Sequence, residues 1–187
     1  VTDGDLMEGI STEAASLAGH LKLGKLIYLY DDNEISIEGS TDLAFTEDRG
    51  KKFEALGWHV QKVTDGNDIE AIDKAIQAAK ADPRPSIIMV RTVIGYGLPN
   101  KQGTAGIHGS PAGVDELNLA KTNANWPLEP AFYYEDEVLA EYRQAIPNGE
   151  KAQNDWVETL SGYANAHPEL AAEFQRRISG ELPENWD

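Results

Sequence analysis

A chain of 187 residues, 41% hydrophobic and 26% charged, is long enough to form one globular domain with a sizeable core. Its formal net charge of −16 argues against nucleic acid or an anionic membrane surface as a partner. The absence of cysteine excludes disulfides, thiolate nucleophiles and zinc–thiolate sites, and no apolar run approaches the ~20 residues that span a bilayer.

Helical and strand periods alternate along the first half of the chain. The pattern predicts helices at 11–21, 48–56 and 68–81, and strands at 26–32, 58–63 and 86–92. The last strand is continuously apolar, as in strands buried on both faces, and the last helix carries an apolar stripe formed by Ile69, Ile72, Ala75, Ile76 and Ala79. The order predicts an α/β fold with a mainly parallel sheet flanked by helices.

Two polar sites, Asp3-Gly4 and Asn33, stand thirty positions apart and enclose a turn, a helix and a strand. Taken singly, Asp3-Gly4 is typical of a turn and Asn33 of a strand end. Ligands of parallel sheets bind beyond the carboxyl ends of the strands, where Asn33 lies. Oxygen ligands there suit a hard cation, and Gly4 would let a diphosphate approach the backbone.

The segment from Asp3 to Asn33 resembles the thiamine-diphosphate motif of the transketolases, which opens on aspartate-glycine and closes on asparagine. Segments 35–39, 53–58, 92–97 and 106–111 follow in that family's order, and the resemblance weakens after Trp126. One departure is Thr2, where the family motif has glycine, and its bulk faces the expected position of the diphosphate. The resemblance implies the thiamine-diphosphate-binding fold.

The resemblance also implies a set of site residues. The cofactors would be thiamine diphosphate and Mg²⁺, with Ca²⁺ or Mn²⁺ as alternatives. The implied roles are metal ligation by Asp3, Asn33 and the Ile35 carbonyl, diphosphate contact at Gly4, contact with the thiazolium ring by Ile37 and Ile94, and a catalytic contact with cofactor and substrate by His108. From the residues alone, the two isoleucines are simply packing residues and His108 is an exposed loop histidine.

Acidic residues near the first helix have two interpretations. Glu8 and Glu13 could interact favourably with the positive end of the helix dipole, or simply face solvent. In the resembled family, matching acids lie at the contact of a homodimer and couple its two active sites. Asp5, Asp31 and Asp32 are expected to be solvated or to lie behind the metal ligands.

The chain starts at Val1, and Asp3 follows only two residues that suit the end of a strand, so we expect a fragment. Residues 1–126 would form part of the diphosphate-binding α/β domain. Residues 127–187 would form a helical extension toward a missing pyrimidine-binding domain, with helices at 135–145, 149–166 and 168–178. The side chains expected to be buried there are Val138, Tyr142, Trp156, Leu160, Tyr163, Leu170 and Phe174.

The implied activity of the parent is transfer of a two-carbon ketol unit from a ketose phosphate to an aldose phosphate. The fragment alone is expected to be inactive, because the family's activating glutamate comes from a domain missing here. The alternatives are a related enzyme such as dihydroxyacetone synthase, or a non-catalytic binding or dimerisation module. The expected location is the cytoplasm, or a plastid if a missing N-terminal segment carried a transit peptide.

Overall fold

The computed structural model describes residues 1–186, which divide into a unit from Val1 to Leu128 and a unit beginning at Glu129. None of the helices in the described part combines the length and hydrophobicity that a membrane span requires. The assignment of residues 127–187 as an extension toward a further domain stays a prediction.

The first unit alternates helices and strands. Its helical elements are α1 (Asp3–Met7), α2 (Gly9–Leu21), η1 (Thr41–Leu43), α3 (Arg49–Ala55), α4 (Ile69–Ala81), η2 (Ala105–Ile107) and α5 (Val114–Asn123). Its strands are β1 (Ile27–Asp32), β2 (Ile35–Ser36), β3 (Gly39–Ser40), β4 (His59–Val63) and β5 (Ser86–Arg91).

The main sheet has the order β1-β5-β4, and both strand pairs are parallel. The first two residues lie along the outer side of β1, where Thr2 bridges Asp31 and the Asp31 N–H donates to the Val1 carbonyl at 2.9 Å. The carboxyl ends of β1 and β5 therefore lie beside the start of α1. The predicted α/β fold with a parallel sheet is confirmed.

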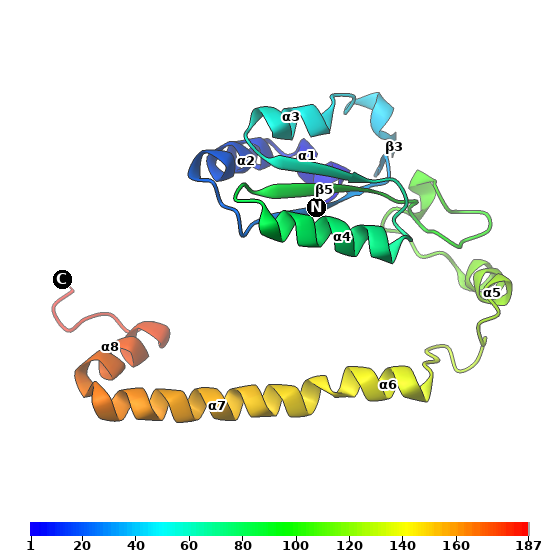
Figure 1. Ribbon diagram of the computed structural model, residues 1–187. Coiled ribbons are helices and arrows are strands. Elements are labelled where there is room, and N and C mark those ends of the chain that lie inside the picture. The colour runs from blue at the N-terminus through cyan, green and yellow to red at the C-terminus, as the bar shows by residue number, and fades with distance from the viewer. Residues whose placement is uncertain (187) are drawn as a thin grey trace. The chain divides into compact units, whose positions relative to one another are not determined.

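Helices cover both faces of this sheet (Figure 1). On one face, α1, α2 and α3 enclose a core that includes Tyr30, Phe53 and Trp58. The Trp58 indole donates to the Ala15 carbonyl at 2.8 Å, so its polar atom is satisfied inside the core. On the other face, α4 packs Ala75 and Ala79 onto β5 and β4.

Aspartates set the starts of two helices. Asp48 Oδ1 accepts from the Lys51 N–H at 3.0 Å before α3, and Asp68 Oδ1 accepts from the Ala71 N–H at 2.9 Å before α4. Two expectations were wrong and one helix was missed. Asp3-Gly4 lies in a short helix instead of a turn, α5 was not predicted, and Ile69 is 78% exposed because it stands in the first turn of α4 at the edge of the core.

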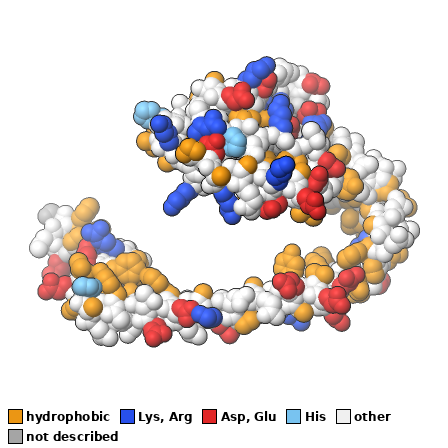
Figure 2. All heavy atoms as spheres, viewed as in Figure 1, with side chains coloured by type: hydrophobic (Ala, Val, Ile, Leu, Met, Phe, Trp, Pro, Cys, Tyr) orange, Lys and Arg blue, Asp and Glu red, His pale blue; other side chains and the backbone are white. Residues whose placement is uncertain are grey.

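The second unit contains α6 (Asp136–Arg143), α7 (Ala145–Ala166) and α8 (Pro168–Ile178), with α8 turned back against α7 (Figure 1). The prediction that its apolar side chains are buried was wrong. Tyr142 is 78% exposed, Leu170 59% and Trp156 50%. Figure 2 shows apolar side chains gathered where α8 meets α7. A pair of helices has too few layers to enclose them, although the Trp156 and Phe174 rings approach to 6.4 Å.

Candidate functional site

A cavity of about 420 Å³ opens at the carboxyl ends of β1 and β5. Three segments far apart in sequence meet there, each following or adjoining a strand of the sheet. They contribute Thr2 and Gly4 at the start of the chain, Asn33 and Ile35 after β1, Ile94 and Gly95 after β5, and His108 from the following loop. The fold thus gathers most residues of the expected site around one hollow.

Thr2 and Gly4 line this hollow, whereas Asp3 between them is not part of its lining and is only 1% exposed. The Tyr30 hydroxyl donates a hydrogen bond to its Oδ1, whereas its buried Oδ2 has no hydrogen-bond partner among the described residues. Burial raises the pKa of Asp3, and the hydrogen bond from Tyr30, the charge of Arg49 and the backbone N–H of Glu34 only partly oppose that effect. A buried carboxylate with an unused oxygen fits a cation, because the ion would supply the missing partner.

Two further carboxylates near Asp3 are already paired. Asp32 forms an ion pair with Arg49 at 2.9 Å, and both side chains are largely buried. Glu34 pairs with Arg91 at 2.6 Å on the exposed rim. Among the described residues Asp3 forms no ion pair of its own, although the charge of Arg49 also acts on it.

The other expected oxygen ligand is Asn33. Its Oδ1 accepts from the Ile35 N–H at 2.9 Å, which fixes the side chain in a local turn after β1. Because an amide oxygen has two lone pairs, one remains for a further partner. No group of three or more His, Asp or Glu side chains suited to a metal occurs in residues 1–186, so any cation site here needs amide, carbonyl or ligand oxygens.

Thr2 and Gly4 form the floor of the cavity at the start of α1. The Thr2 hydroxyl and the Thr2 N–H both donate to Asp5 Oδ2, at 3.1 and 2.8 Å. The hydroxyl is thus engaged with the helix start. A Cβ built on Gly4 would meet only Thr2 Oγ1, at 4.0 Å, so Gly4 keeps open space beside its backbone.

His108 is exposed and follows η2 in the long loop after β5. This loop is tied back at both ends. The Gly103 N–H donates to the Ile94 carbonyl at 2.8 Å, and Lys101 Nζ donates to the Ala112 carbonyl at 2.7 Å. The buried carboxylate of Glu116 holds residues 100–101 from α5. The segment carrying His108 is therefore closed onto the body of the unit.

Besides Asp3, three expected site residues do not line the cavity. Ile37 stands in the tight hairpin between β2 and β3 and is 70% exposed, whereas Ile94 is half-buried and lines the hollow. Glu8 and Glu13 are exposed at the junction of α1 and α2 and on α2. The structure therefore does not bring Ile37, Glu8 or Glu13 to the hollow.

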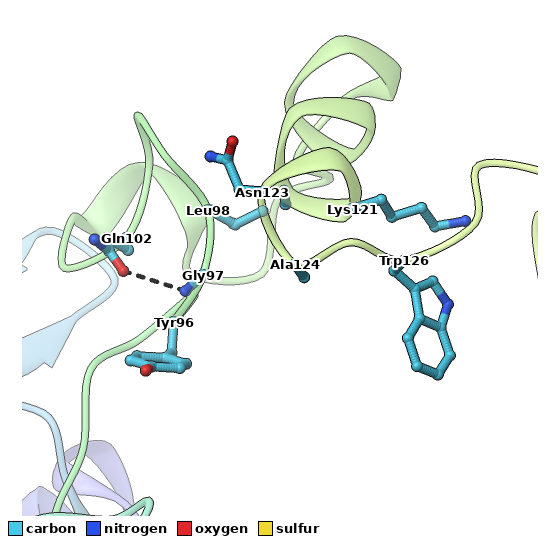
Figure 3. Close-up of a pocket in the computed structure, with 9 residues that line it drawn as sticks. Tyr96, Gly97, Leu98, Gln102, Lys121, Asn123, Ala124 and Trp126 are labelled. Atoms are coloured by element: carbon cyan, nitrogen blue, oxygen red, sulfur yellow. Dashed lines mark hydrogen bonds between the residues drawn. The ribbon is translucent and has the colours of Figure 1, made fainter.

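A larger hollow, of about 570 Å³, lies between the loop after β5 and α5. Figure 3 shows its lining, in which Gly97 N–H donates to Gln102 while the rings of Tyr96 and Trp126 point in different directions. Its walls are mainly apolar, and none of the expected site residues is among those that line it. The smaller cavity at the strand ends therefore remains the stronger candidate.

The thiamine diphosphate binding domain model of the transketolases matches residues 1–183. The chain belongs to this family. The predicted membership in the transketolase family is confirmed. Thiamine diphosphate is the cofactor of this type of domain.

The transketolase domain is similar to curated transketolases along nearly its whole length. It is 51% identical to that of Geobacillus stearothermophilus over 187 residues and 54% identical to that of Nostoc sp. strain PCC 7120. Each match covers 99% of this chain and 28% of the relative. The chain thus spans a little over a quarter of the length of these relatives.

Solved transketolases share its fold. The Pichia stipitis enzyme in complex with sedoheptulose 7-phosphate matches with a TM-score of 0.86 and 46% identity, over 100% of this chain and 28% of that one. The Leishmania mexicana enzyme matches with a TM-score of 0.87 and 42% identity, over 99% of this chain and 28% of that one.

Sequence reasoning missed several residues of the transketolase domain that surround the expected ligands. Tyr30 belongs to the core and donates to Asp3, Arg49 pairs with Asp32, and Glu116 holds the loop of His108. Only Tyr30 left a signal, since strand alternation places it on the same face as Tyr28. The contacts of Arg49 and Glu116 depend on how distant segments pack.

Proposed function

We propose that Asp3, Asn33 and the Ile35 carbonyl hold a divalent cation, Mg²⁺ or its substitutes Ca²⁺ and Mn²⁺, in this thiamine diphosphate binding domain. The observation that supports this most directly is the buried Asp3 Oδ2 that lacks a partner. One carboxylate, one amide and one carbonyl leave positions that diphosphate oxygens and water could complete around an octahedral ion.

In this proposal, Gly4 leaves room for the diphosphate, because its backbone borders the cavity without a side chain. Ile94 and Ile37 would shield the thiazolium ring, and Ile37 would need to lose its exposure on binding. His108, on the rim, would contact both cofactor and substrate. When bound, thiamine diphosphate supplies an electron sink for carbon–carbon bond cleavage and formation.

For the whole protein, the proposed activity is transfer of a two-carbon ketol unit from a ketose phosphate to an aldose phosphate. The family membership supports it, as does the fact that one similar structure contains sedoheptulose 7-phosphate. The chain alone is expected to be inactive, because the glutamate that activates the cofactor in this family comes from a domain outside the matched region.

A homodimer is proposed for the whole protein, with Glu8 and Glu13 at the contact between subunits. Their exposure on α2 and at its start is compatible with that role. A cytoplasmic location stays a prediction based on the family. A sedimentation experiment with Glu8→Gln and Glu13→Gln variants of the full polypeptide would test the dimer contact.

A dihydroxyacetone synthase remains the second candidate, because the same motif serves both enzymes. Ketol transfer by the full polypeptide to formaldehyde, compared with transfer to ribose 5-phosphate, separates the two. A binding or dimerisation module without chemistry would show metal or cofactor binding and no transfer to either acceptor.

Calorimetric titration of the chain with thiamine diphosphate, in Mg²⁺ and in EDTA, tests the proposed site. We expect binding that requires Mg²⁺ and that is lost in Asp3→Ala. Asp73→Asn on α4 is the matched control, since it removes an exposed carboxylate on the opposite face of the sheet. Metal-independent binding, or binding unchanged by Asp3→Ala, would contradict the proposal.

A further inference from the structure

Lys101 connects the two ends of the loop segment that carries His108. Its Nζ donates to the Ala112 carbonyl at 2.7 Å, across 11 positions of the chain. Its N–H donates to Glu116 Oε1 at 3.1 Å, and its carbonyl accepts from the Thr104 hydroxyl at 2.8 Å. Every polar group of Lys101 is thus engaged, and His108 lies in the segment that the Nζ contact closes.

The part of the loop that follows His108 depends on this contact. Within the chain as the structure describes it, no other hydrogen bond reaches residues 109–112. Gly109 and Gly113 have positive φ, at 72° and 90°, and lack side chains that would restrain the backbone. A segment with so few contacts opens easily when its one tie is removed.

The side chain of Lys101 is held in place from α5. Glu116 is buried there, and its carboxylate oxygens accept from the N–H and the Nδ2 of Asn100. These hydrogen bonds lower the pKa of Glu116, and the ammonium charge of Lys101 adds to that effect, so the two charges attract each other. The buried carboxylate therefore keeps the Lys101 ammonium within reach of Ala112.

The position of the His108 imidazole is set by the backbone on either side of it. The His108 N–H donates to the Ala105 carbonyl at 3.0 Å at the end of η2, whereas the imidazole forms no hydrogen bond within residues 1–186. His108 and Gly109 both line the cavity at the strand ends. One side of His108 is therefore fixed by η2 and the other by the segment that Lys101 ties down.

We infer that Lys101 is a positioning residue that holds His108 at the rim of the cavity, where it contacts the cofactor and the sugar phosphate. Without the Nζ contact the loop samples more conformations, and His108 spends a smaller fraction of the time at the cavity. Binding that requires this position is weakened by the same fraction. The inference rests on the proposed role of His108.

The test is a double-mutant cycle in the full polypeptide, with kcat/KM for ketol transfer as the readout. Its members are the wild type, Lys101→Met, His108→Ala and the double variant. Methionine keeps most of the aliphatic stem and removes the ammonium group. We expect Lys101→Met to lower kcat/KM about 10-fold when His108 is present. In the His108→Ala background the same change should cost less than about 2-fold, since Lys101 acts through His108.

Lys74→Met is the matched control. Lys74 is an exposed lysine on α4, a helix that does not line the cavity. This variant removes the same ammonium group and should leave kcat/KM unchanged. A merely structural role of Lys101 would lower kcat/KM by the same factor with and without His108, and that result would overturn the inference.

The outcomes separate the inference from the proposed function. If the wild type transfers no ketol unit, or if His108→Ala keeps the wild-type kcat/KM, the proposed function at His108 is wrong and the inference falls with it. If His108→Ala lowers kcat/KM and Lys101→Met does not, only the inference is wrong.

A second measurement needs no variant and decides the question if Lys101→Met does not fold. Acylation of the wild-type polypeptide with an N-hydroxysuccinimide ester of acetic acid, followed by mass spectrometry, gives a rate for each lysine. We expect Lys101 to react about 10-fold more slowly than Lys74, because its amine must first leave Ala112.

The same rates report whether Lys101 is coupled to the cofactor. Saturation with thiamine diphosphate and Mg²⁺ should slow the acylation of Lys101 further and leave that of Lys74 unchanged. The physical reason is that binding at His108 and closure of the loop favour each other. A Lys101 rate equal to that of Lys74, or one that the cofactor does not change, would contradict the inference.

Discussion

Glu116 on α5 holds Asn100 in the loop after β5 through both of its carboxylate oxygens. Such contacts of an exposed carboxylate would exchange readily with water, but Glu116 is only 7% exposed. Its Oε1 accepts from the Asn100 N–H at 2.7 Å and its Oε2 from Asn100 Nδ2 at 2.9 Å, while the Lys101 N–H donates to Oε1 at 3.1 Å. These hydrogen bonds lower the pKa of Glu116. A helix that was not predicted thus anchors the loop that carries His108.

The first prediction concerns this anchor. In Glu116→Gln the amide oxygen can still accept from the backbone, but the amide NH₂ group faces the Asn100 Nδ2 donor. This loss costs about 1–3 kcal/mol of local stability. We expect proteolysis within residues 99–113 to become on the order of 10-fold faster. Asp115→Asn, a neighbouring change of an exposed carboxylate on α5, should leave the rate unchanged. If Glu116→Gln is cleaved no faster than Asp115→Asn, other contacts hold the loop.

The second prediction concerns Gly4. The free chain tolerates Gly4→Ala, because the new Cβ meets only Thr2 Oγ1 at 4.0 Å, and alanine favours α1 by up to about 1 kcal/mol. The added methyl would nevertheless occupy space at the cavity. We expect thermal stability to be kept or raised while the affinity for thiamine diphosphate with Mg²⁺ falls about 10-fold, a loss of ~1.4 kcal/mol. Unchanged affinity by calorimetry would remove Gly4 from the diphosphate contact.

The third prediction concerns the close packing of α2 against the end of α3. A Cβ at Gly19 would stand 1.8 Å from the Leu56 carbonyl oxygen, which is backbone and has no room to move aside cheaply. Gly19→Ala should therefore lower the free energy of unfolding by about 2–4 kcal/mol. Gly9→Ala on the same helix meets nothing within 4 Å and should be neutral or stabilising. Denaturant unfolding followed by circular dichroism measures both.

The fourth prediction concerns the second unit. Hydrogen bonds from Arg176 and Arg177 lower the pKa of Glu173 on α8 from 4.5 to about 2. Because this pKa is lowered in the folded state, the stabilisation is complete above the ordinary value and is lost as the pH falls toward 2. Nuclear magnetic resonance of the Glu173 carboxyl should give a midpoint near 2.

The matched variant for that titration is Arg176→Gln combined with Arg177→Gln. Removing both donors should return the Glu173 midpoint toward 4.5 and reduce the loss of α8 helicity on acidification. High salt should act in the same direction, since these side chains are accessible to solvent and ions screen them. A midpoint near 4.5 in the wild type would show that the arginine contacts are not maintained in solution.

Much of the fold could be predicted because its signals are local. The aspartates at 48 and 68 mark helix starts, and the apolar run from Ile87 to Val90 marks a strand buried on both faces. The family motif places Asp3 and Asn33 at one end of the sheet in the same way. What local patterns missed was α5, whose helix is held in place by the Glu116 contacts to a loop 15 to 16 residues away.

The sequence by itself determined the family, the order of strands and helices along the chain and the residue types offered to a cofactor, since each depends on short-range pattern. Only the tertiary structure decided that Asp3 is buried with one oxygen free, that Tyr30 occupies the other, and that Ile37 stays exposed. It also decided that the apolar side chains of α7 and α8 remain largely uncovered. Burial and the pairing of hydrogen-bonding groups depend on which distant segments pack together. The hydrophobic periodicity of a single segment does not contain that information.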